Sequence, residues 1–187
     1  MESNTIALLV MDMQTGILGR LPQQGEAIIN KVADAIKAAR EKNLLVIFVR
    51  VGFKKGLPEI SPANKMFYGF KEQLKGASLG AFMQISPGLG ITEDDIVVDK
   101  KRVSAFSGSD LEMILRANNI SSLVLTGIAT SGVVLSTLRE AFDKDYQLTV
   151  LSDGCADSDE EMHQFLIQKL LPKQAGVITI NEWKIKA

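Results

Sequence analysis

The chain is poor in the residues that build cross-linked or metal-dependent structures. It has one cysteine, Cys155, and one histidine, His163, among 187 residues. A single cysteine cannot form an internal disulfide bond, and these two side chains together cannot supply a Cys/His zinc site. We therefore expect a protein without a bound metal and without a cofactor.

Charge of one sign and long hydrophobic runs are also missing. The 21 Lys and Arg residues nearly balance the 22 Asp and Glu residues, and no long basic run occurs. The electrostatic footprint of a nucleic-acid-binding domain is therefore absent. The apolar run 6–11 near the start is too short for a signal peptide or a membrane span. We expect a cytoplasmic protein that acts on a small molecule, and neither nucleic acid nor membrane as a partner.

What remains is the composition of an ordinary globular protein, with 46% hydrophobic and 23% charged residues. The length suits one compact unit with a sizeable core. No internal repeat or low-complexity linker divides the chain. We expect a single domain over residues 1–187.

Short apolar runs alternate with longer amphipathic segments along the chain. The run 6–11 is continuously apolar, which predicts a strand buried on both faces, and residues 26–42 carry apolar side chains at helical spacing. Repetition of this order predicts an α/β fold, a six-stranded and mostly parallel Rossmann-like sheet between two helical layers. The expected strands are 6–11, 44–49, 96–98, 122–126, 148–151 and 176–180, and the expected helices are 26–42, 109–117, 133–143 and 159–170.

Residues 52–94 break this pattern and mix Gly, Pro and Lys with aromatic side chains. The aromatic residues include Phe67, Tyr68, Phe70 and Phe82. Such a segment forms a pocket wall, a subunit contact or a satellite of the core. We expect some of these side chains to close a pocket or to meet a second subunit, and we expect a homo-oligomer.

Ligands of open parallel sheets bind beyond the carboxyl ends of the strands. Asp12 follows the first predicted strand, and Lys100 follows the third. An ammonium group beside a buried strand needs an anionic partner, and Asp12 is the obvious one. Two alternatives stay open: Asp12 serves only a turn, and the pair serves only packing. Arg102 either binds an anionic substrate or is solvated.

Several short motifs together resemble the isochorismatase-like, or cysteine hydrolase, family. The resemblance covers nearly the whole chain and implies the fold described above and a hydrolase activity. The motifs are Val10-x-Asp-Met-Gln14, Lys100 four residues ahead of Ser104-Ala-Phe106, Gly108-x-x-Leu111, Gly127-x-Ala-Thr130, Thr137-Leu-Arg-Glu-Ala141 and Asp153-Gly-Cys-Ala-Asp157.

The family uses an aspartate, a lysine and a nucleophilic cysteine. By position, the resemblance assigns the first two roles to Asp12 and Lys100, whereas the cysteine position holds Val133. Valine has no nucleophilic atom, so no covalent thioester can form there. The family often has a cis peptide bond where this chain has Ile128-Ala129, and we expect one there. The predicted substrate-contacting residues are Gln14, Arg102, Ile128, Ala129, Thr130, Ser131 and Gly132.

Other nucleophiles are not evident. Thr130 and Ser131 have no obvious base, and His163 falls in a predicted helix, where packing is its expected role. Cys155 follows the fifth predicted strand and is expected to be a buried structural thiol. The Asp, His and His zinc cluster of the superfamily's nicotinamidases is missing from the sequence.

Two functions follow. The first is an enzyme in which Asp12 acts as general acid or base, while Lys100 orients it and stabilises developing negative charge. The family resemblance implies that such an enzyme cleaves a small-molecule vinyl ether or amide, here without a covalent intermediate. The alternative is a degenerate family member that binds a small ligand or a protein partner without turnover.

Overall fold

The computed structural model describes residues 5–19, 21, 25–74 and 78–186. Its strands form one six-stranded sheet in the order β3-β2-β1-β4-β5-β6, and all neighbouring strands are parallel. The predicted α/β fold is thereby confirmed, with the Rossmann strand order. The strands are β1 (Ile6–Met11), β2 (Leu45–Val51), β3 (Ile96–Lys100), β4 (Ser122–Ile128), β5 (Gln147–Ala156) and β6 (Gly176–Ile178).

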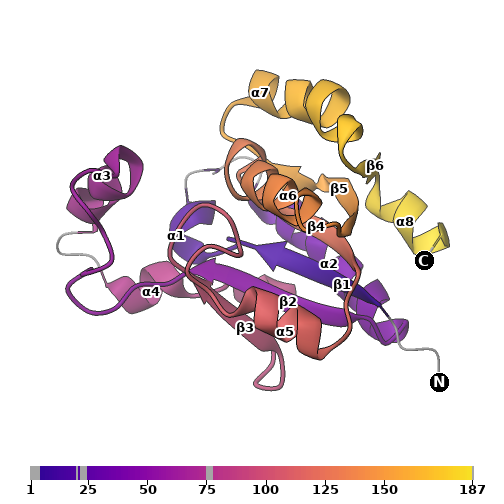
Figure 1. Cartoon of the computed structure of the whole chain (residues 1–187), viewed down its shortest axis with the longest axis horizontal. Helices are drawn as coiled ribbons and strands as arrows, with labels where there is room; N and C mark the ends of the chain where they lie inside the picture. The colour runs from indigo at the N-terminus through magenta and orange to yellow at the C-terminus, as the bar shows by residue number, and fades with distance from the viewer. Residues whose placement is uncertain (1–4, 20, 22–24, 75–77, 187) are drawn as a thin grey trace.

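Helices cover both faces of the sheet (Figure 1). Successive side chains of a strand point to opposite faces. Leu8 of β1 therefore packs in one cluster with residues of α2 (Gly25–Glu41) and α8 (Ile180–Lys186). Leu9 packs in the other cluster with residues of α5 (Leu111–Ala117) and α6 (Leu135–Phe142). The central strand β1 is thus buried on both sides, as its unbroken apolar run predicts.

The segment between β2 and β3 contains helices that the hydrophobic pattern did not reveal. They are α3 (Lys65–Gln73) and α4 (Leu79–Met83), and Figure 1 shows α3 standing apart from the sheet. Both helices begin at a side-chain cap, since Asn64 accepts a hydrogen bond from the backbone N–H of Phe67 and Ser78 accepts one from Ala81. The helices are too short for their apolar residues to establish a clear helical period.

The C-terminal part differs from the prediction at its boundaries. The strand expected over 176–180 ends at Ile178, and α8 then begins at Ile180. A capping box explains this change, because the backbone N–H of Thr179 donates to Glu182 Oε2 and the backbone N–H of Glu182 donates to Thr179 Oγ1. The helix expected over 159–170 is α7 (Glu160–Phe165) followed by the π-helical turn η3 (Leu166–Leu170).

Within the described ranges, none of the helices combines the length and the apolar content that a membrane crossing requires.

Candidate active site

Asp12 and Lys100 meet at the carboxyl ends of the sheet. Asp12 directly follows β1 with φ 59°, a left-handed conformation that aspartate tolerates better than most residues. Its backbone N–H donates to the carbonyl of Val49 at 2.8 Å, which fixes the residue to β2. Lys100 ends β3, two strands away, so roughly 10 Å separate the strands. The long lysine side chain spans this gap and places Nζ 2.9 Å from Asp12 Oδ2.

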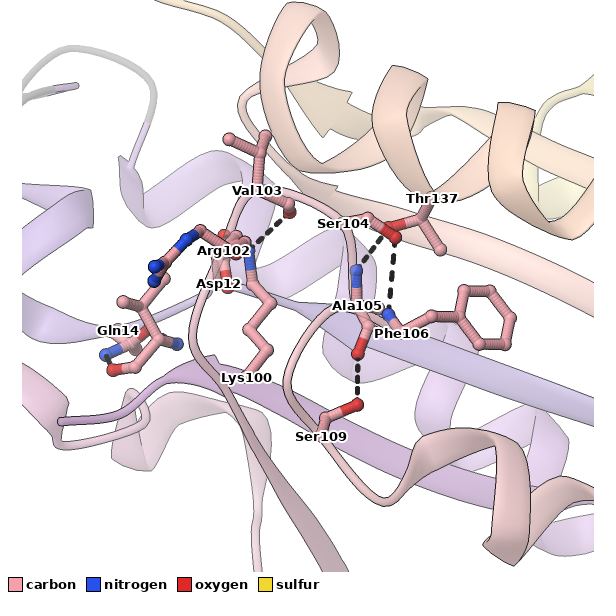
Figure 2. Close-up of polar contacts among 11 residues, drawn as sticks. Asp12, Gln14, Lys100, Arg102, Val103, Ser104, Ala105, Phe106, Ser109 and Thr137 are labelled. Carbon is pink, nitrogen blue, oxygen red and sulfur yellow. Dashed lines mark hydrogen bonds and ion pairs between the residues drawn. The ribbon is translucent and has the colours of Figure 1, made fainter. Parts of the chain in front are cut away.

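The ammonium group of Lys100 uses all its protons within the protein. Besides Asp12, Nζ donates to the carbonyl oxygen of Arg102 at 3.0 Å. It also donates to the carbonyl oxygen of Val103 at 2.6 Å (Figure 2). An ammonium group has three N–H donors, and these three acceptors match them. Lys100 is 1% exposed. Its ammonium therefore positions the carboxyl group and has no further proton with which to bind a ligand.

The carboxyl group of Asp12 is held in an environment that favours proton exchange near neutral pH. Burial raises the pKa of Asp12 to about 6, against the lowering effects of the positive charge and hydrogen bond of Lys100. Burial also lowers the pKa of Lys100, against the opposite effect of Asp12. Asp12 Oδ1 is buried and has no hydrogen-bond partner among the described residues. One carboxyl oxygen is thus tied to Lys100, and the other is free to act.

The turn after β4 forms one side of the same cavity. The peptide bond between Ile128 and Ala129 is cis, as the family resemblance led us to expect. The chain then enters the π-helical turn η2 (Thr130–Val134), which continues into α6. Ile128, Ala129, Gly132 and Val133 line the cavity together with Asp12 and Lys100. Val133, to which the resemblance assigns the family's cysteine position, therefore lines the same cavity as the Asp–Lys pair.

The two hydroxyl groups of this turn are engaged elsewhere. Thr130 Oγ1 lies 2.8 Å from His163 Nδ1, and both side chains are buried. The Oγ and the backbone N–H of Ser131 both donate to Asp157 Oδ2, at 2.7 and 2.8 Å. Thr130 and Ser131 do not line the cavity. Their predicted contact with substrate stays a prediction, and Asp157 is a residue of this network that the sequence analysis did not single out.

Gln14 and Arg102 also make contacts within the protein. The amide of Gln14 is fully buried, accepts from Val51 N–H at 2.7 Å, and donates to the carbonyl oxygens of Val51 at 3.1 Å and Phe82 at 3.3 Å. The guanidinium of Arg102 donates to the carbonyl oxygens of Lys101 and Glu59. Neither residue lines the cavity. Their predicted role in substrate binding is untested.

The cavity above the Asp–Lys pair has a volume of about 230 Å³. Its walls include Ile17, Val51 and Val103, and α3 contributes Phe67 and Phe70. The aromatic segment between β2 and β3 thus supplies a pocket wall, one of the three roles considered for it.

The other two predicted aromatic residues lie elsewhere. Phe82 is buried against Phe70, with ring centroids 4.9 Å apart, and Tyr68 is 40% exposed. A contact of this segment with a second subunit remains a prediction.

Cys155 lies within β5, which extends further than the sequence analysis expected, so it does not follow the strand. Burial raises the pKa of its thiol to about 12, and the residue does not line the cavity of Asp12. Among the described residues, no group of three or more His, Cys, Asp or Glu side chains could hold a metal ion.

Comparison with known proteins agrees with this geometry. Residues 6–182 match the model of the isochorismatase domain. The isochorismatase family protein YecD of Escherichia coli O157:H7 is 30% identical over 189 residues, which covers 97% of this chain and 96% of that protein. The ureidoacrylate amidohydrolase RutB of Stutzerimonas stutzeri (strain A1501) is 33% identical over 185 residues, covering 88% of this chain and 75% of that protein.

A solved structure shows the same similarity. An isochorismatase family protein from Burkholderia thailandensis superposes with a TM-score of 0.83 at 30% identity, covering 98% of this chain and 97% of that one. Members of the family are hydrolases. The fold, the Asp–Lys pair and the sequence match lead to one conclusion: this chain belongs to the isochorismatase family.

Proposed function

We propose that this chain is a hydrolase that transfers protons through Asp12 Oδ1 and forms no covalent thioester. The observation that carries the proposal is a buried carboxyl oxygen without a partner at the floor of a cavity, with a pKa of about 6. A group with such a pKa is present in both protonation states near neutral pH, which general acid–base catalysis requires. Lys100 holds the second oxygen, so that Oδ1 alone exchanges the proton.

Cleavage of a vinyl ether would use the protonated form of Asp12. The proton moves from Oδ1 to the terminal vinyl carbon, whose π electron pair forms the new C–H bond and leaves an oxocarbenium ion. Water adds to the cationic carbon and returns a proton to Oδ1. The resulting hemiketal then breaks into a carbonyl compound and an alcohol. No nucleophilic side chain takes part, so Val133 is compatible with this route.

Cleavage of an amide would use the carboxylate form. Oδ1 accepts a proton from water while the water oxygen attacks the amide carbon and the carbonyl π pair moves to its oxygen. Asp12 then returns the proton to the amide nitrogen as the C–N bond breaks. The products are a carboxylic acid and an amine. This route also needs no thiol, because water itself is the nucleophile.

The replacement of the nucleophile favours a second candidate, a family member that binds a ligand without turnover. By the family resemblance, the cysteine position falls on Val133. The hydroxyl groups of Thr130 and Ser131 are bound to His163 and Asp157. Thr130 and Ser131 do not line the cavity, so neither hydroxyl group is placed to attack a ligand held there.

A substrate panel of vinyl ethers, amides and esters tests the proposal. We expect wild type to turn over at least one class, and Asp12→Asn to lower kcat/KM for it by about two to four orders of magnitude. Asp95→Asn is the matched control, because Asp95 pairs with Arg40 at 2.6 Å outside the cavity. It should change stability without this kinetic loss. Failure of wild type on the whole panel would favour the non-catalytic candidate. Full activity of Asp12→Asn would instead show that the protein is an enzyme in which Asp12 does not transfer the proton.

A further inference from the structure

The cavity is apolar apart from its floor. Of its described lining residues, the polar side chains are those of Asp12, Lys100 and Ser158, which is exposed to solvent. The remaining side chains are aliphatic, aromatic or thioether groups. A volume of about 230 Å³ exceeds the roughly 150 Å³ of an engineered apolar cavity that binds benzene. One ring with a short substituent therefore fits the space.

The described residues that line the cavity offer no cation to a ligand. Lys100 is the one cationic residue among the described residues that line it, and its three protons are taken. The guanidinium groups nearby point elsewhere: Arg50 pairs with Asp99 at 2.6 Å, and Arg102 donates to backbone carbonyl groups and lies over the ring of Phe67. A carboxylate ligand would be desolvated without a partner and would face the carboxyl group of Asp12.

The floor of the cavity instead offers one hydrogen-bond acceptor. Asp12 Oδ1 is buried without a partner, whereas Oδ2 is bound to Lys100. A buried carboxylate oxygen in this position gains most from a neutral N–H or O–H donor, because a donor satisfies it without bringing in a second negative charge.

We propose that the cavity selects an uncharged ligand that consists of an apolar body of about one ring and a single N–H or O–H group donating to Asp12 Oδ1. The described lining has no charge partner for an anionic substrate such as a dicarboxylate, so we expect such substrates to bind more weakly. The inference rests on the proposed function because it uses the same pocket. It concerns binding, so it also holds for a protein without catalytic activity.

Three ligands separate the contributions. Phenylacetamide has the ring and the donor, phenylacetate has the ring with a negative charge, and acetamide has the donor without the ring. We expect calorimetric titration of the whole chain at pH 7.5 to give a Kd for phenylacetamide more than about tenfold below those of the other two. Equal binding of phenylacetate or acetamide, or no binding of phenylacetamide, overturns the inference.

A charge placed in the wall should reverse the preference. Met66 lines the cavity yet is 59% exposed, so Met66→Arg can keep its charge hydrated and still reach a ligand. We expect the affinity ratio to shift toward phenylacetate by about tenfold. Met113→Arg, which is 69% exposed on α5 outside this cavity, is the control and should leave the ratio unchanged. An unchanged ratio in Met66→Arg would contradict the assigned basis of selectivity.

Turnover is followed by NMR in the same samples, which keeps the two proposals distinguishable. Tight binding of phenylacetamide without turnover of any panel substrate refutes the proposed catalysis and leaves the ligand class intact. Turnover of a carboxylate substrate by wild type refutes the ligand class and leaves proton transfer by Asp12 intact.

Discussion

Replacing Lys100 by methionine should be among the most damaging single changes near the site. The substitution keeps a long apolar stem and removes the ammonium that serves Asp12 and the carbonyl groups of Arg102 and Val103, at 2.6 to 3.0 Å. All these groups surround a side chain that is 1% exposed, so water does not readily replace the lost donor. Breaking a buried ion pair in this way costs about 3–5 kcal/mol of unfolding free energy.

The loss should depend on pH in a definite direction. Without Lys100, only burial acts strongly on Asp12, so its pKa in the folded protein rises further above about 6. A folded-state pKa above the unfolded value gives stability that is present at low pH and is lost as the pH rises through the folded pKa. Lys100→Met should therefore be less destabilised at pH 5 than at pH 7.5.

Urea unfolding followed by circular dichroism at both pH values measures the effect. The control is Lys37→Met, whose exposed pair with Glu41 at 4.0 Å should contribute less than about 1 kcal/mol. The double variant Asp12→Asn with Lys100→Met should be more stable than Lys100→Met alone, because no uncompensated charge remains buried. A loss below about 1 kcal/mol at both pH values would show that the pair is effectively hydrated.

Three further predictions concern the same region. The kcat/KM of wild type should change with pH in one direction around the pKa of Asp12, about 6. It should fall above this pH if Asp12 acts as an acid, and fall below it if Asp12 acts as a base. A flat profile from pH 5 to 7 would exclude Asp12 from proton transfer. Iodoacetamide at pH 7.5 should neither label Cys155 nor change the activity of the folded protein, because the thiol is buried and has a pKa of about 12. Mass spectrometry of the treated protein measures the labelling. Labelling of Cys155 in the native state would contradict its burial. Asp157→Asn should lower the free energy of unfolding by about 1–3 kcal/mol, because two donors of Ser131 lose a charged acceptor. The control is Asp143→Asn at the exposed end of α6, which should change the free energy of unfolding by less than about 0.5 kcal/mol. Urea unfolding measures both.

The sheet and the meeting of Asp12 with Lys100 could be predicted because each depends on a strong local signal. The apolar runs that become β1 and β2 are nearly unbroken, and strands buried on both faces need such runs. Parallel strands bring their carboxyl ends to one edge, so polar residues directly after them converge. Sequence position alone therefore placed Asp12 near Lys100.

Side-chain direction could not be predicted in the same way, because it depends on partners that are distant in the sequence. Thr130 and Ser131 adjoin the cavity wall in sequence, but His163 and Asp157 from the C-terminal part bind their hydroxyl groups. The hydrogen bonds of the Lys100 ammonium likewise depend on the path of the chain after β3, which brings the carbonyl groups of Arg102 and Val103 to Nζ. The capping box of Thr179 and Glu182 was a local signal for α8 that the strand prediction passed over.

The amide of Gln14 has a consequence for how the cavity wall is held. It bonds to Val51 at the end of β2, and to Phe82 in α4, part of the way along the segment that leads to β3. Phe67 and Phe70 lie on the chain between these two points. Bringing two distant points of a chain together costs entropy, and the buried amide offsets part of that cost together with the backbone bonds of Thr15 to Gln84 and of Ser86 to Met13. A change at this amide would therefore remove one buried contact at each of the two points that flank the aromatic wall, while the backbone bonds near Gln84 remain.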